Sequence, residues 1–170
     1  MVSTAIVAII FSAVVAQLRN STGLNDINTA FQELRANFES ARLYSLAGRV
    51  TNDGFPSGGY GIIFRADNNT YDLFADHDNN GILSGADTIV ESHKIFGTTQ
   101  LTGIEYTTGP AAENNWQPIG GNQLTVTFQP PLVTINPSLA DATYVRLILN
   151  NSVSGQQREF IFSIVNGFSL

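Results

Sequence analysis

MVSTAIVAIIFSAVVAQL, residues 1–18, contains no charged side chain, and the first charge of the chain is Arg19. A run of about 18 apolar residues is close to the shortest that crosses a bilayer as a helix. A helix of this composition is apolar on every side, which suits lipid or the interior of a helical bundle rather than a surface in water. The stretch therefore predicts a helix that lipid or other protein covers.

The residues of this stretch leave three interpretations open. It is a membrane segment that the mature protein retains, a secretory signal that is cleaved after Ala16, or a buried core helix. Small residues over Val14–Ala16 fit such a cleavage, but the basic region that precedes the apolar core of a secretory signal is missing.

The next segment, residues 19–48, predicts an amphipathic helix of about twenty residues with one face for a core. Gly23 lies in a polar stretch that is a weak point of the helix, Asn25 or Asp26 is the expected N-cap, and Gly48 suits the position just past the C-terminus. Apolar residues recur at helical spacing: Ile27, Phe31, Leu34 and Phe38.

After Gly48 the pattern changes to short strands separated by turn residues. Predicted strands are Tyr60–Phe64, Thr70–Phe74, Thr88–Phe96, Gln100–Thr107, Gln123–Phe128, Thr143–Leu149 and Glu159–Val165. Asn114–Gly121 and Pro130–Pro137 are predicted loops. One helix followed by antiparallel strands predicts an α+β fold. We expect a long N-terminal helix, apolar in its first half and amphipathic in its second, packed on an antiparallel β-sheet domain over residues 49–170.

Composition excludes several classes of protein. The chain has no cysteine, so a disulfide scaffold, a thiolate zinc site, an iron–sulfur cluster and a thiol nucleophile are excluded. Lys and Arg number 8 against 14 Asp and Glu, a net charge of −6. We expect no nucleic-acid partner, because phosphate contacts need clustered Lys and Arg.

The most specific local motif is acidic. Residues 76–87, DHDNNGILSGAD, fit the EF-hand calcium loop with Asp in place of Glu at the last position. Strand-like residues precede the loop where an EF-hand has a helix, so we expect a structural calcium site rather than a sensor. The alternative is an Asx-rich hairpin loop whose side chains bond only their own backbone. Predicted ligands are Asp76, Asp78 and Asn80 through side-chain oxygens, Ile82 through its backbone carbonyl, Ser84 directly or through water, and Asp87 at the closing position.

The other chemically capable residues form no catalytic pattern. His77 is expected to be solvated and His93 to lie on the solvent face of a strand, without the spacing of a zinc site. Trp116 is expected to cover the edge of the core. Three glutamates have no evident partner for a glycosidase-like carboxylate pair: Glu105, Glu113 and Glu159. We expect no enzyme activity and no cofactor other than calcium.

The order of these segments resembles the type IV pilin-like proteins, which include pilins, minor pilins and type II secretion pseudopilins. Met1–Phe11 resembles the part of a prepilin just after its conserved start. Phe31–Ser45, followed by Gly58–Phe64, resembles the H-type pseudopilins, in which a helix ending in a Leu-Arg…Ala-Arg run leads into the first strand. The family's basic leader, its processing site and its nearby glutamate have no counterpart, so the resemblance places Met1 a few residues inside the processed protein.

The resemblance implies a non-catalytic structural subunit, a minor pilin or H-type pseudopilin, and favours a retained apolar segment. Residues 1–18 are then the membrane and filament-core half-helix, and the partners are other pilin-like subunits. The implied location is the inner membrane, followed by a periplasmic or cell-surface filament. The alternative is a secreted or singly anchored calcium-binding β domain that recognises a ligand and forms no filament.

Overall fold

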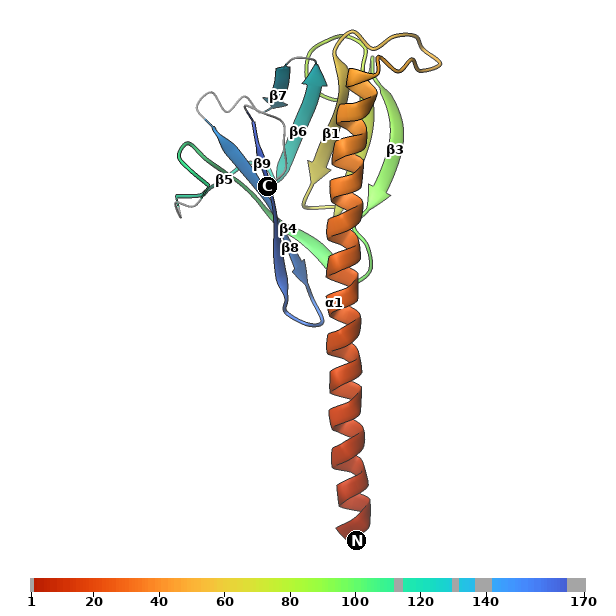
Figure 1. The fold of residues 1–170 in the computed structure, drawn as a ribbon, viewed down its shortest axis with the longest axis vertical. Coiled ribbons are helices and arrows are strands. Elements are labelled where there is room, and N and C mark those ends of the chain that lie inside the picture. Colours follow the sequence, from red (N-terminus) through yellow and green to blue (C-terminus); the bar gives the residue numbers. More distant parts are fainter. Residues whose placement is uncertain (1, 112–114, 130–131, 137–141, 165–170) are drawn as a thin grey trace.

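One long helix precedes all strands of the chain, so the predicted α+β fold is confirmed (Figure 1). The structure, a computed structural model, describes residues 2–111, 115–129, 132–136 and 142–164, and their side chains from Ile10 onward outside residues 132–136. The described elements are α1 (Val2–Leu46), β1 (Gly59–Arg65), β2 (Thr70–Asp76), β3 (Thr88–Lys94), β4 (Thr99–Thr107), β5 (Gln117–Pro118), β6 (Gln123–Gln129), β7 (Leu132–Asn136), β8 (Tyr144–Asn151) and β9 (Gln157–Ser163).

Helix α1 continues through the polar stretch at which the sequence predicts a weak point and a new N-cap. Both predictions are wrong, because these residues contact the β-strand region instead. Gly23 is buried against the β8–β9 turn, where an added Cβ would lie 2.8 Å from the Asn151 side chain. Asp26 accepts hydrogen bonds from the backbone N–H and the hydroxyl of Thr98, at 3.1 and 2.9 Å.

The C-terminus of α1 ends as the sequence predicts. Gly48 has a φ of 59°, the left-handed conformation that glycine adopts at low cost. Its N–H donates to the Ser45 carbonyl and the N–H of Arg49 donates to the Tyr44 carbonyl, which together form a Schellman motif. Among the residues that the structure describes, no helix combines the length and the apolar character needed to cross a membrane.

The strands form two antiparallel sheets, with the orders β3-β2-β1-β6-β7 and β5-β4-β8-β9. Pro130–Pro137 is wrongly predicted as a loop, since Leu132–Asn136 forms β7 and pairs with β6. The predicted loop Asn114–Gly121 contains the two-residue strand β5, which pairs with β4. The β-branched residues of Leu132–Asn136 are typical of a strand, so β7 has a signal that the flanking prolines outweigh, whereas the two residues of β5 carry none. Val165, the last residue of the predicted C-terminal strand, lies outside the described residues.

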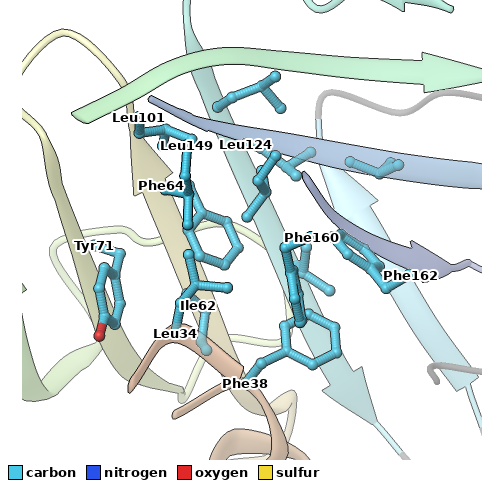
Figure 2. Close-up of a cluster of buried hydrophobic side chains, with 14 of the residues drawn as sticks. Leu34, Phe38, Ile62, Phe64, Tyr71, Leu101, Leu124, Leu149, Phe160 and Phe162 are labelled. Atoms are coloured by element: carbon cyan, nitrogen blue, oxygen red, sulfur yellow. The ribbon is translucent and has the colours of Figure 1, made fainter. Parts of the chain in front are cut away.

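The second half of α1 and both sheets contribute to one hydrophobic cluster (Figure 2). Phe38 of α1 is fully buried, and its ring centroid lies 5.0 Å from that of Phe128 in β6 and 5.3 and 4.8 Å from those of Phe160 and Phe162 in β9. One helical side chain thus contacts a strand of each sheet. In Figure 1 the first half of α1 extends away from the strands.

Candidate metal centre

The acidic loop, residues 76–87, connects β2 to β3. Asp76 is the last residue of β2, and Asp87 directly precedes β3. Carboxylate oxygens of Asp76, Asp78 and Asp87 lie within 4.8 Å of one another, so these three side chains can hold a metal ion. Asp76 is buried, Asp87 is half-buried and Asp78 is exposed. The cluster therefore combines a buried carboxylate at the end of β2, an exposed one in the loop and a half-buried one just before β3.

Asp76 is the inner wall of this cluster. Its carboxylate accepts hydrogen bonds from the backbone N–H of Gly81 at 2.9 Å and of Asn80 at 3.3 Å. Gly58 covers it so closely that an added Cβ would lie 2.3 Å from the carboxylate. Burial raises the pKa of Asp76 above its usual value, and the nearby charge of Asp87 adds to the increase against the opposing backbone N–H donors.

The other two carboxylates bond to the loop itself. Asp87 accepts from the backbone N–H of His77 at 2.8 Å with one oxygen and from that of Ser84 at 2.7 Å with the other. Asp78 accepts from the Ser84 hydroxyl at 2.9 Å and from the Asn80 side-chain amide at 2.8 Å. These bonds orient the carboxylates but leave each of them with further lone pairs.

The remaining predicted ligands bond within the loop. The Asn80 side-chain oxygen accepts from the backbone N–H of Ile82 at 2.8 Å, and the Ser84 hydroxyl donates to Asp78. Gly81 has a φ of 74°, which is the sharp turn that the glycine at the sixth position of an EF-hand loop makes. Three of the six predicted ligands therefore converge as carboxylates, while Asn80 and Ser84 make Asx-type and hydroxyl contacts.

A small polar cavity adjoins Asp76. Its volume is about 170 Å³, and Thr127 and Gln129 of β6 line it together with Gly81. The Thr127 hydroxyl donates to the Gly81 carbonyl at 3.1 Å. Of the three clustered carboxylates only Asp76 lines this cavity, so the cavity lies beside the cluster rather than between its members.

The donor set is chemically suited to a hard cation. Among the residues that the structure describes, no Lys, Arg or His forms an ion pair with the three carboxylates. Carboxylates brought this close repel one another unless a proton or a cation lies between them. Calcium prefers oxygen ligands and takes carboxylates, carbonyls and water at variable geometry.

Both histidines are half-buried, and each ring contacts a neighbouring side chain. The His77 Nε2 lies 3.1 Å from the Thr51 hydroxyl, so its ring contacts another loop. The His93 ring stacks on Tyr71 with centroids 5.0 Å apart, because β3 places it opposite Tyr71 in β2. His93 also lies 3.2 Å from the Glu91 carboxylate, and neither histidine ring joins the carboxylate cluster.

A charged cluster on the second sheet was not predicted. Arg146 of β8 bonds to Glu105 of β4 at 2.5 Å and to Glu159 of β9 at 3.3 Å. Its guanidinium lies 4.5 Å from the centre of the Trp116 ring, so Trp116 contacts this cluster. Glu105 and Glu159 therefore share Arg146 as a partner, contrary to expectation. Glu113 lies outside the described residues.

No protein-family model matches the chain, and no curated protein or solved structure is significantly similar to it. The functional assignment therefore rests on the residues and geometry of this chain.

Proposed function

We propose that the protein is a non-catalytic structural subunit of a type IV pilus-like or type II secretion pseudopilus filament, with a globular domain that calcium stabilises. The single observation that carries this proposal is the division of α1. Its second half is buried in the domain core, whereas apolar side chains of its first half are exposed, including Phe11 at 69%.

The exposed side chains continue the charge-free stretch with which the sequence begins. They are Ile10, Phe11, Val14 and Leu18. A patch of this kind on one protruding helix marks a surface that lipid or another protein chain covers. A helix satisfies its backbone hydrogen bonds within itself, so it is stable in lipid. Packing against lipid or against copies of the same helix then removes these side chains from water. We place the subunit in the inner membrane before assembly and in a periplasmic or cell-surface filament afterwards.

The test compares two charged variants on the same helix. Phe11→Asp with Val14→Asp places charge in the exposed first half, and Leu43→Asp is the matched control, since Leu43 is apolar and 60% exposed beside the domain. We expect the wild type and the control to sediment as oligomers or filaments after detergent removal. The double variant stays monomeric, because a buried charge in such a contact is costly.

The outcomes separate the candidate functions. Oligomers or filaments that the first-half variant abolishes support a filament subunit. A protein that binds vesicles but sediments as a monomer without detergent supports the singly anchored calcium-binding domain instead. A wild type that remains a dispersed monomer without detergent or lipid contradicts both a filament and a membrane segment.

The calcium part of the proposal predicts a rise in melting temperature. At a calcium concentration about one hundred times the dissociation constant, binding adds about 2.7 kcal/mol, or about 5–10 °C for a chain of this length. Thermal melts in calcium and in chelator measure this shift. Asp87→Asn abolishes it, whereas the control Asp67→Asn, in the exposed β1–β2 turn, retains it. An unchanged wild-type melt contradicts the site.

The effect of calcium also depends on pH. The pKa of Asp76 is raised in the folded state, so in chelator its contribution to stability is fully present below the usual pKa of aspartate and is lost as pH rises through the raised value. Calcium binds only the ionised carboxylate. We therefore expect the calcium-induced rise in melting temperature to shrink as pH falls through the raised pKa. A rise that is constant across that range argues against Asp76 as a ligand.

A further inference from the structure

The connection between α1 and β1, residues 49–58, is bonded to the acidic loop. The Ser57 hydroxyl donates to the His77 carbonyl at 2.8 Å, and the Thr51 hydroxyl lies 3.1 Å from His77 Nε2. The Thr88 hydroxyl donates to Asp53 at 2.5 Å. The two segments, far apart in the sequence, therefore share side-chain hydrogen bonds in addition to the strand pairing of β1 with β2.

Each of these bonds involves a residue next to a proposed calcium ligand. His77 follows Asp76 in the chain, and its N–H donates to Asp87. Thr88 follows Asp87. The N–H of Gly58 donates to the Asp76 carbonyl at 2.8 Å. A change in the position of either carboxylate is thus transmitted through one peptide unit to the connection.

The connection has bonds of its own within Thr51–Gly54, and near its two ends the Tyr60 hydroxyl donates to the Arg49 carbonyl and the Gln129 amide to the Ser57 carbonyl, each at 3.1 Å. Its backbone pairs Thr51 with Gly54 in a single isolated bridge. Val50 and Phe55 are apolar, and each is 62% exposed. A segment with few buried apolar contacts opens at low free energy, so its order depends on the neighbours that hold it.

We propose that the connection and the acidic loop form one cooperative unit, so that calcium bound at the acidic loop determines how ordered the connection, with its exposed Val50 and Phe55, is. This inference rests on the calcium site proposed above. Because coupling between two sites is reciprocal, loosening the connection also lowers the affinity of the acidic loop for calcium.

Hydrogen exchange of the full chain in detergent micelles, followed by mass spectrometry of peptides from residues 49–58 and 76–88, tests the coupling. The uncoupled variant is Ser57→Ala with Thr88→Val, which removes two of the four bonds between the segments and no ligand, and retains the Thr51–His77 contact and the Gly58–Asp76 backbone bond. The control is Thr143→Val, whose hydroxyl donates to the Thr108 carbonyl beside the second sheet. Calorimetry measures calcium binding by each protein in parallel.

In the wild type and the control we expect calcium to slow exchange in residues 49–58 about fivefold or more, which is the lower range of measured couplings. In the uncoupled variant calcium still binds, but it slows the exchange of residues 49–58 by a smaller factor than in the control, because two of the four bonds are gone. Calcium binding to the wild type without any slowing in residues 49–58 overturns the inference.

Absence of calcium binding in calorimetry overturns the metal site and, with it, the calcium control of the connection. Coupling between the connection and the acidic loop is then tested by hydrogen exchange in the absence of calcium. If the uncoupled variant exchanges faster than the control in residues 76–88 as well as in 49–58, the two segments are one unit. If only residues 49–58 exchange faster, they are not.

Discussion

The two halves of α1 are parts of one unbroken helix, yet they have opposite surroundings. Leu34 and Phe38 in the second half are fully buried, whereas Phe11 and Leu18 in the first half are mostly exposed. The difference lies in the partner rather than in the side chains, because both halves carry large apolar residues. The second half finds its partner within the chain, whereas the large apolar side chains Phe11, Val14 and Leu18 of the first half stay exposed.

The largest effect is expected from matched phenylalanine truncations. Phe38→Ala removes a ring that contacts β6 and β9, and we expect a loss of about 3–5 kcal/mol in the free energy of unfolding. Phe11→Ala removes an exposed ring, and we expect a change below about 0.5 kcal/mol. Chemical denaturation of both variants in detergent micelles, which keep the chain monomeric, measures the difference.

Equal losses in the two variants would break the comparison, since they would mean that the first half of α1 also packs within its own chain. Filament assembly would sharpen the comparison, because there we expect the opposite order. Phe11→Ala weakens assembly directly, whereas Phe38→Ala weakens it only by unfolding the domain.

The sequence predicts the elements whose side-chain pattern is periodic. The spacing of Ile27, Leu34 and Phe38 gives the buried face of α1, and Gly48 gives its end. The alternation in β1 and β2 is weak, but the flanking turn residues locate both strands. The spacing of Asp76, Asp78 and Asp87 predicts a cluster that the structure forms.

The remaining features depend on contacts between distant segments. The β7 strand carries the β-branched residues Val133, Thr134 and Ile135, but the prolines on both sides favour a loop, and pairing with β6 decides its structure. The Arg146–Glu105 pair requires the register of β8 on β4, where these two residues are direct partners. Asn25 and Asp26 are good N-cap residues, yet neither begins a helix, because α1 continues through them. The Asp26 carboxylate bonds to Thr98 of the β3–β4 turn instead of capping a helix.

The second prediction concerns the point at which the two halves meet. Gly23 is buried there, and an added Cβ would lie 2.8 Å from Asn151 and from Ser154. We expect Gly23→Ala to destabilise the domain by about 1–3 kcal/mol through overpacking, despite the better helix propensity of alanine. Thermal melts measure the change, with Gly120→Ala as control, because nothing lies within 4 Å of a Cβ at that position. A stabilised Gly23→Ala variant would mean that the helix stands away from the β8–β9 turn.

The smallest effect is expected at Asp26, one turn further along α1. Its carboxylate holds the β3–β4 turn through the N–H and hydroxyl of Thr98, and that hydroxyl in turn accepts from the Asn151 amide at 2.8 Å. We expect Asp26→Ala and Thr98→Val each to cost about 1–2 kcal/mol, with a coupling of about 1 kcal/mol in the double-mutant cycle. Additive losses would show that the two side chains stabilise the domain independently. A coupling of the expected size shows that a polar contact between α1 and the β3–β4 turn stabilises the end of the packed half of the helix, where Asn151 of the β8–β9 hairpin also bonds to Thr98.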